Sequence, residues 1–267
     1  MASVWLNGDL LDESEARLAT TDRGFTLGDG VFETIRANEF LPLWLSDHLQ
    51  RLRAGADQIG LPVPFQDDAI ADAIGRLLAT TKQKVSAVRL TVSRGSMTAR
   101  GLWPVDATSR PTCLLTAAAG GAHPAQDVVV ARTTRRNEFS PLSRIKSLNY
   151  GDNIIARREA ISRGATDALM LNTKGHVACA TVGNVFIRTA GRWMTPTIPD
   201  GILSGLARWR LIKEIGAIEA TLTIDDVGRA DAAFISNSLG CSMIRSIDGR
   251  LLSGTIDEGP LHSIYSV

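Results

Sequence analysis

The chain has 267 residues, which is enough for one large domain or two smaller ones. Hydrophobic residues make up 44% of it and charged residues 21%, and 29 Lys and Arg against 28 Asp and Glu leave a net charge of +1. This balance excludes a disordered tail or a collagen-like chain, and it provides no basic field that would attract nucleic acid or an anionic membrane.

The three cysteines, Cys113, Cys179 and Cys241, lie far apart and form no cluster with histidines. Their spacing predicts no zinc site, and their odd, sparse count indicates reduced thiols rather than a disulfide framework. Residues 1–17 meet acidic side chains at once, without the apolar core of a signal peptide, and no stretch is apolar enough for a membrane span. We therefore expect a cytoplasmic protein without metal ions, nucleic-acid partners or membrane contacts.

The first part of the chain carries both strand and helix patterns. Two apolar runs flank Asn7-Gly8, a pair that favours a tight hairpin turn. Ser46 is a candidate cap for a helix that ends before Gly60. In chain order, the patterns predict a hairpin at 4–11, a strand at 31–36, helices at 46–59 and from Asp67 or Asp68 onward, and a strand at 88–95.

A run of small and turn-forming residues at 117–127, AAAGGAHPAQD, predicts a linker between domains at 1–118 and 126–267. Strands outnumber helices and do not alternate strictly with them. That order favours a two-domain α+β fold over a doubly wound sheet. In the second part, the patterns predict strands at 128–133, 168–171, 185–188, 233–236 and 243–247 and helices at 149–163 and 204–215.

One lysine is distinguished by its neighbours, because Ile145 and Leu148 flank Lys146. An amine in apolar surroundings loses stabilisation of its charge, so its pKa falls and it can attack a carbonyl to form a Schiff base. A lysine stem among apolar residues can equally extend its ammonium group to solvent. The chain contains no P-loop, GxSxG, HExxH or GxGxxG motif, so this lysine is the main chemical signal.

Several segments resemble the class IV (fold-type IV) pyridoxal phosphate enzymes, which include branched-chain and D-amino-acid aminotransferases and aminodeoxychorismate lyases. They are DRGFTLGDGVFETIRA at 22–37, DHLQRLRAGADQIGL at 47–61 and NEFSPLSRIKSLNYGDNIIARREA at 137–160. TVGNVFI, TPTIPDGILSGLAR and ISNSLGCSMI follow in the family's order. The resemblance covers nearly the whole chain. It implies an α+β fold of two domains, an active site at the domain interface and a homodimer.

The resemblance also implies roles toward pyridoxal 5'-phosphate. Lys146 would hold the cofactor as a Schiff base and move protons, and Arg51 would pair with the phosphate, for which a bidentate guanidinium is well suited. The ordinary alternative for Arg51 is a solvated helix face. Further cofactor contacts are implied for the backbone N–H groups of Leu206 and Ala207 at a helix start, for the turn residues Asn237 and Ser238, and for the hydroxyl of Tyr150.

Position 179 departs from the family, which usually has a glutamate where this chain has Cys179. The carboxylate keeps the pyridine nitrogen protonated, so that the ring accepts electrons from the substrate carbon. Three interpretations are open: a thiolate paired with the pyridinium, a reaction that needs less electron withdrawal, or a weak enzyme. Pyruvate elimination from aminodeoxychorismate is such a reaction, because aromatisation of its product drives it.

Substrate contacts are expected in the segment SRGSMTARGLWP at 93–104. Arg100 is the first candidate for the substrate carboxylate and Arg94 the second, with a structural arginine between loop glycines as the alternative. Phe32 occupies a position where several relatives carry an active-site tyrosine, so it can pack against substrate but cannot form a hydrogen bond. Leu239 is a further candidate substrate contact.

Together these features predict an aminotransferase that moves an amino group between an amino acid and a 2-oxo acid by ping-pong kinetics. Aminodeoxychorismate lyase is the close alternative, since it would use the same cofactor contacts. A binding protein for pyridoxal phosphate with little turnover is the alternative from another class, supported by Cys179.

Overall fold

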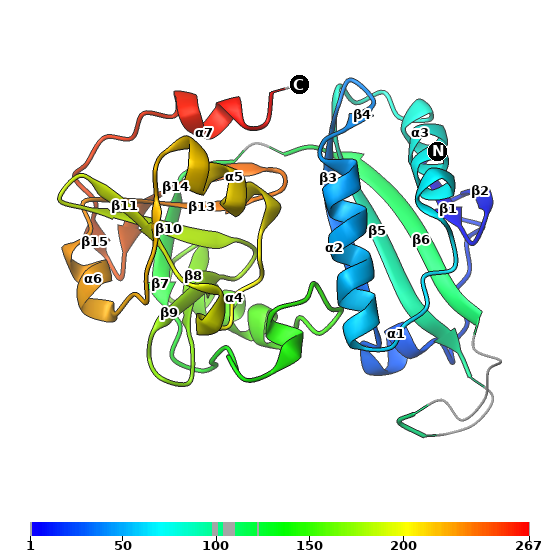
Figure 1. Ribbon diagram of the computed structural model, residues 1–267, viewed down its shortest axis with the longest axis horizontal. Coiled ribbons are helices and arrows are strands. Elements are labelled where there is room, and N and C mark those ends of the chain that lie inside the picture. Colours follow the sequence, from blue (N-terminus) through cyan, green and yellow to red (C-terminus); the bar gives the residue numbers. More distant parts are fainter. Residues whose placement is uncertain (1, 98–100, 104–109, 122, 267) are drawn as a thin grey trace. The chain divides into compact units, whose positions relative to one another are not determined.

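The computed structural model describes residues 2–97, 101–103, 110–121 and 123–266, which form two compact units (Figure 1). Unit 1 contains the chain up to Gly120 together with Ile145–Asn149, and unit 2 contains Gly121–Arg144 and Tyr150–Ser266. The division after Gly120 falls inside the expected linker. The segment Ile145–Asn149, which we expected in the C-terminal domain, belongs instead to unit 1.

Unit 1 is built on a six-stranded antiparallel sheet in the order β2-β1-β6-β5-β3-β4. Helix α2 contacts β3, and helix α3 contacts β6 and β1, so both pack on this sheet (Figure 1). The elements are β1 (Ser3–Leu6), β2 (Asp9–Asp12), α1 (Arg23–Leu27), β3 (Gly30–Asn38), β4 (Leu41–Pro42), α2 (Leu45–Gln58), α3 (Asp67–Ala79), β5 (Val85–Ser96) and β6 (Arg110–Ala119).

Local sequence signals explain most of these boundaries. The predicted hairpin turn is confirmed, because Asn7 and Gly8 both have positive φ angles, of 52° and 115°. The predicted cap at Ser46 is wrong: α2 begins at Leu45, after Trp44 with φ of 54°, so Ser46 lies inside the first turn. Strand β6 was not predicted, and its last residues, Ala117–Ala119, fall in the run of small residues that was interpreted as the linker.

Segment Ile145–Asn149 joins unit 1 through backbone hydrogen bonds to the start of β3. The Phe32 N–H donates to the Lys146 carbonyl at 2.9 Å, and the Leu148 N–H donates to the Gly30 carbonyl at 2.9 Å. Gly30 allows this approach, since a Cβ there would lie 2.5 Å from the Val92 carbonyl oxygen and 2.7 Å from Leu148 Cδ1. The lysine is thereby fixed against β3 although it lies over a hundred positions away in sequence.

Unit 2 contains a mixed sheet in the order β12-β11-β10-β13-β14-β7-β8-β9, with β15 paired to β14. The pairs β7/β8, β7/β14 and β11/β12 are parallel and the others antiparallel, which confirms the predicted α+β class. The strands are β7 (Gln126–Val130), β8 (Asp167–Leu171), β9 (Val177–Ala180), β10 (Asn184–Thr189), β11 (Arg192–Thr195), β12 (Ile218–Glu219), β13 (Ala232–Asn237), β14 (Gly240–Ile247) and β15 (Arg250–Leu251). The helices are α4 (Gly151–Ser162), α5 (Leu206–Glu214), α6 (Ile224–Arg229) and α7 (Gly259–Ser263), with short 3-10 turns at Pro141–Ser143 and Ile198–Asp200.

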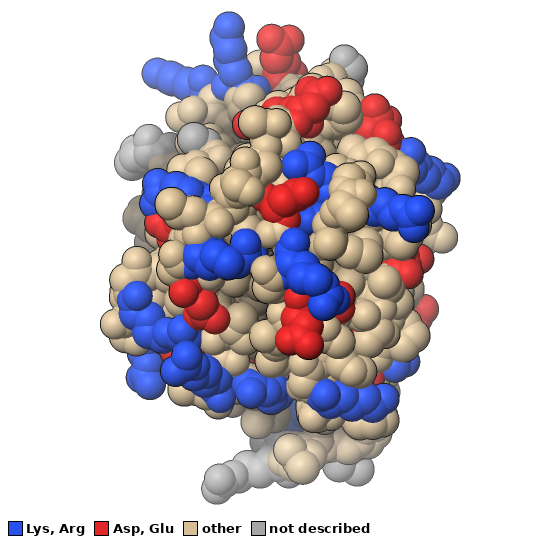
Figure 2. Space-filling view, turned by 90° about the vertical axis from the view of Figure 1, so that its left-hand side faces the viewer, with Lys and Arg blue, Asp and Glu red and all other residues tan. Residues whose placement is uncertain are grey.

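The surface carries charges of both signs. On the face drawn in Figure 2, acidic and basic side chains lie interspersed rather than gathered by sign. Ion pairs of unit 2 include Arg188–Asp231 and Arg163–Asp248. Among the described residues, no helix is both long and apolar enough to cross a bilayer.

Candidate functional site

The side chain of Lys146 lies half-buried against Phe32 in unit 1. Its Nζ is 4.4 Å from the centre of the Phe32 ring, and Phe32 is itself only 4% exposed. The two backbone hydrogen bonds described above hold the lysine segment beside the same strand. The apolar surface beside this amine is therefore the Phe32 ring of β3.

Burial is the largest effect on the charge of Lys146, and it lowers the pKa of the amine to about 8. The positive charges of Arg51 and Arg89 lower this pKa further, whereas the carboxylate of Glu33 raises it. Roughly a tenth of this amine is therefore unprotonated at pH 7 and about half at pH 8, and the unprotonated form can act as a nucleophile.

A fully buried carboxylate, Glu33, organises the charges around the lysine. It accepts hydrogen bonds from Arg51 Nε at 2.8 Å, from Arg51 Nη2 at 2.6 Å and from His48 Nδ1 at 2.7 Å. Although burial alone would raise the pKa of Glu33, these partners lower it to about 2, so the carboxylate stays ionised. Burial lowers the pKa of His48, so the neutral ring donates through Nδ1–H, and Nε2 has no hydrogen-bond partner among the described residues.

The structure shows how Arg51 is oriented. Its Nε and Nη2 both donate to Glu33, so one of the two bidentate edges of the guanidinium is occupied. The pairing of Arg51 with a phosphate stays a prediction. The carboxylate fixes the plane of Arg51, so the positive charge is held in place before any anion arrives.

Three residues of this cluster were missed in the sequence: Glu33, His48 and Arg89. Glu33 occupies the same strand phase as the buried Val31 and Ile35, so a charged residue in phase with the core was the available signal. Arg89 stacks on Phe32 with its Cζ 3.7 Å from the ring centre. It faces the same ring as Lys146, and an alternating strand pattern gives no indication of that.

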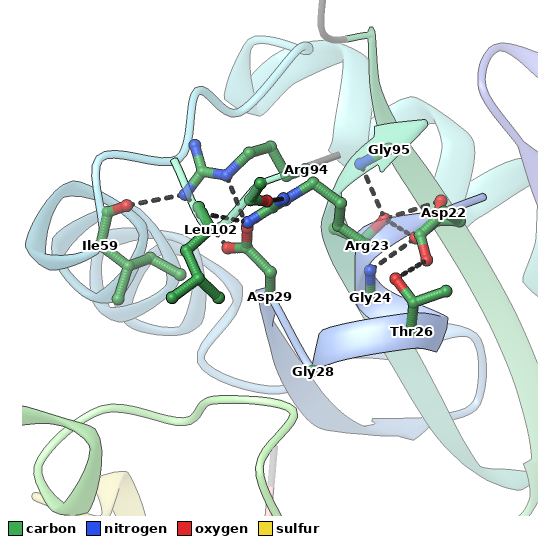
Figure 3. Close-up of polar contacts among 12 residues, drawn as sticks. Asp22, Arg23, Gly24, Thr26, Gly28, Asp29, Ile59, Arg94, Gly95 and Leu102 are labelled. Atoms are coloured by element: carbon green, nitrogen blue, oxygen red, sulfur yellow. Dashed lines mark hydrogen bonds and ion pairs between the residues drawn. The ribbon is translucent and has the colours of Figure 1, made fainter. Parts of the chain in front are cut away.

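Arg94 lies near the end of β5, and its contacts are structural. Figure 3 shows that Arg23 and Arg94 both bind Asp29. Arg94 donates to Asp29 Oδ2 at 2.7 Å and Oδ1 at 3.1 Å, and to the carbonyls of Ile59 and Gly60 at 2.8 Å each. Four of its five N–H groups are used and the residue is 4% exposed, which favours the structural alternative over substrate binding.

Arg23 anchors the segment that follows β5. Its guanidinium binds Asp29 at 2.8 Å and also donates to the carbonyls of Gly101 and Leu102 (Figure 3). Arg100, our first candidate for a substrate carboxylate, lies outside the described residues, so its role stays a prediction.

Unit 2 offers two backbone elements suited to an anion. Helix α5 begins at Leu206 and Ala207, follows Gly205, and has no acidic residue in its first turn. A Cβ at Gly205 would lie 2.1 Å from Asn184 Oδ1, so only glycine allows this close approach of the helix start to β10.

The second element is the turn that carries Asn237 and Ser238. Ser236, one residue before it, is directly opposite Asn184 in the pairing of β13 with β10. Its Oγ is buried and has no hydrogen-bond partner among the described residues. A polar atom without a partner in this place fits a site completed by a bound polar group. Leu239, in the same turn, accepts a hydrogen bond from His123 at its carbonyl.

Cys179 lies on β9 opposite Met170 and is 8% exposed. Burial raises the pKa of this thiol, and the nearby Arg136, which acts in the opposite direction, does not reverse the shift. The chain's own charges therefore keep the thiol protonated, which removes support from the thiolate interpretation. Tyr150, the remaining predicted cofactor contact, is the half-buried N-cap residue of α4.

Comparison with known proteins places this geometry in a family. The family model described as "Amino-transferase class IV" matches residues 30–247. The chain is 32% identical to a putative branched-chain-amino-acid aminotransferase from Methanocaldococcus jannaschii, over 94% of this chain and 89% of that protein. It is 30% identical to an aminodeoxychorismate lyase from Bacillus subtilis, over 88% of this chain and 83% of the lyase.

Solved structures agree. A branched-chain aminotransferase from Thermoproteus uzoniensis, crystallised with norvaline, superposes with a TM-score of 0.87 at 28% identity, over 99% of this chain and 93% of that chain. The resemblance predicted from the sequence is thereby confirmed. This chain belongs to the class IV aminotransferase family, whose members are pyridoxal phosphate enzymes of fold type IV.

Proposed function

We propose that this protein transfers an amino group between an amino acid and a 2-oxo acid, with pyridoxal 5'-phosphate held by Lys146. The observation that carries the proposal is the half-buried amine with a pKa of about 8, beside a fixed arginine charge. In this family setting, a lysine with a lowered pKa is suited to condense with the cofactor's aldehyde. When bound, the cofactor withdraws electrons from the bond broken at the substrate's α-carbon.

The residues present fit this cofactor. In unit 1, Arg51 would supply a charge for the phosphate. In unit 2, the N–H groups of Leu206 and Ala207 and the turn of Asn237 and Ser238 would supply neutral donors. The buried hydroxyl of Ser236, which has no hydrogen-bond partner among the described residues, would be a further donor to the cofactor. Once the substrate's amine has taken the place of the lysine on the cofactor, the free amine of Lys146 is the group that would accept and return a proton at the α-carbon.

Arg89 is our candidate for the substrate's carboxylate. Its guanidinium stacks on the same ring as Lys146 and is close enough for its charge to lower the pKa of the lysine. Arg94 is not proposed, because Asp29, Ile59 and Gly60 occupy its guanidinium. An arginine beside the reactive amine favours amino acids and oxo acids over simple amines.

Aminodeoxychorismate lyase is a second candidate, favoured by one observation. The thiol at Cys179 is protonated, and a neutral group would do less than the glutamate usual in the family to keep the pyridine nitrogen protonated, so the ring would withdraw fewer electrons. The lyase reaction needs less electron withdrawal, and one relative is a lyase. We further propose that the protein is a cytoplasmic homodimer, as the resemblance implies.

The direct test of the proposed reaction is a product assay on protein loaded with pyridoxal phosphate. We expect branched-chain or D-amino acids with 2-oxoglutarate to give a new amino acid. Incubation with aminodeoxychorismate separates the alternative, because p-aminobenzoate and pyruvate would identify a lyase. If neither substrate set gives product while the cofactor binds, the interpretation as a binding protein replaces both.

The acidity of Lys146 is directly measurable in cofactor-free protein. Reductive ¹³C-methylation makes each lysine visible by NMR, and Lys146→Arg identifies the resonance. We expect this resonance to titrate near pH 8, since burial and two nearby arginines disfavour the ammonium. The exposed Lys213 serves as the internal comparison. A midpoint for Lys146 at the ordinary value of 10.5 would contradict the proposed nucleophile.

Replacement of Cys179 tests the electron-withdrawal argument. Cys179→Glu should raise the rate of transamination about tenfold or more, because a carboxylate at this position would stabilise the protonated pyridine nitrogen of the cofactor. The nearby positive charge of Arg136 would keep this carboxylate ionised. Cys179→Gln is the matched control, since it has the same shape without the charge. Equal rates in the two variants would show that charge at position 179 does not limit the reaction.

A further inference from the structure

The turn between β13 and β14 is a short loop of two residues, Ser238 and Leu239, between the paired Asn237 and Gly240. The Leu239 N–H donates to Asn237 Oδ1 at 2.8 Å, which closes the turn internally. Two side chains from distant parts of the sequence then bind its backbone carbonyls. The residues that make these two contacts are not among those for which the resemblance implies a role.

Tyr265, which follows α7 near the C-terminus, holds the first carbonyl. Its hydroxyl donates to the Asn237 carbonyl at 2.7 Å. The tyrosine is 5% exposed, and its oxygen lies 3.7 Å from Sγ of the buried Cys241. Because water is largely excluded, the hydrogen bond does not compete with solvent and strongly restrains the turn.

His123, from the segment before β7, holds the second carbonyl. Its Nε2 lies 3.0 Å from the Leu239 carbonyl, so Nε2 must carry the hydrogen in this contact. The imidazole also packs against Gly240, where a Cβ would lie 2.4 Å from His123 Cδ2. The ring therefore occupies the space of a side chain at position 240 and supports the turn directly.

An anion-binding turn must present N–H and hydroxyl groups and keep its carbonyl oxygens away, because these oxygens repel an anion. We propose that Tyr265 and His123 are positioning residues that hold the turn Asn237–Gly240 in an anion-receiving conformation by binding the Asn237 and Leu239 carbonyls. The anion is a phosphate group. Its assignment to the cofactor rests on the proposed function.

The C-terminal segment also reaches the other anion-binding element of unit 2. Ser263 Oγ, at the end of α7, donates to Glu214 at the end of α5 at 3.3 Å. One short segment thus contacts the turn that carries Ser238 and the last residue of α5, at the opposite end of that helix from Leu206 and Ala207.

The test compares pyridoxal phosphate with pyridoxal, which lacks the phosphate. Tyr265→Phe removes one hydroxyl and keeps the ring. We expect it to weaken pyridoxal phosphate binding roughly fivefold to tenfold, as for one lost hydrogen bond, and to leave pyridoxal binding unchanged. Thr195→Val is the matched control, because the Thr195 hydroxyl is a fully buried donor to the Val185 carbonyl in the same unit. Both affinities are measured by absorbance titration of the folded proteins.

The outcomes separate the two claims. Unchanged pyridoxal phosphate affinity in Tyr265→Phe and His123→Ala overturns the inference, and so does an equal loss for both ligands. If the wild-type protein binds inorganic phosphate by ³¹P NMR but not pyridoxal phosphate, the proposed function fails. The two variants are then judged by their phosphate affinity alone. A wild-type protein that binds neither ligand contradicts both claims.

Discussion

The ion pair of Glu33 with Arg51 is the interaction on which the site in unit 1 depends. A carboxylate with no exposed surface is stable only when donors surround it, and here the donors are one guanidinium edge and one neutral imidazole. Because the folded pKa of Glu33 is about 2, below the ordinary value of 4.5, the pair stabilises the fold above pH 4.5. That contribution is lost as the pH falls from 4.5 toward 2.

The same pair sets the electrostatics of the lysine. Lys146 and Arg89 both face the ring of Phe32, and the charges of Arg51 and Arg89 lower the pKa of the amine. Burial is the larger cause of the pKa near 8, and the carboxylate of Glu33 opposes it by favouring the ammonium. Glu33 therefore limits how far the pKa of Lys146 falls, while its ion pair holds the charge of Arg51 in place.

Much of the fold was readable from the sequence, and the reasons are local. The hairpin at Asn7-Gly8 and the period of Val31 and Ile35 are set by backbone and burial preferences within a few residues. The place of residues 145–149 was not readable, because it is determined by hydrogen bonds to Gly30 and Phe32, far away in the sequence. Because of those hydrogen bonds, Lys146 lies beside β3, and the lysine segment belongs to unit 1 rather than to the predicted C-terminal domain.

The site residues divide in the same way. The lysine was found from its apolar neighbours and the resemblance, whereas Glu33 and Arg89 required the three-dimensional arrangement around Phe32. Arg94 was a candidate because the resemblance implies an arginine of this loop at the substrate carboxylate, yet its partners are Asp29 and backbone carbonyls. A pattern of residues shows that an arginine is present, but only the contacts show whether its donors are already used.

The central claim is that the amine at position 146 condenses with pyridoxal phosphate, and borohydride reduction tests it most directly. Reduction of the loaded protein fixes the adduct, and peptide mass spectrometry locates it. We expect a phosphopyridoxyl group on Lys146 and none on Lys174 or Lys213. An adduct on either of those lysines, or no adduct in protein that retains the cofactor, would contradict the account.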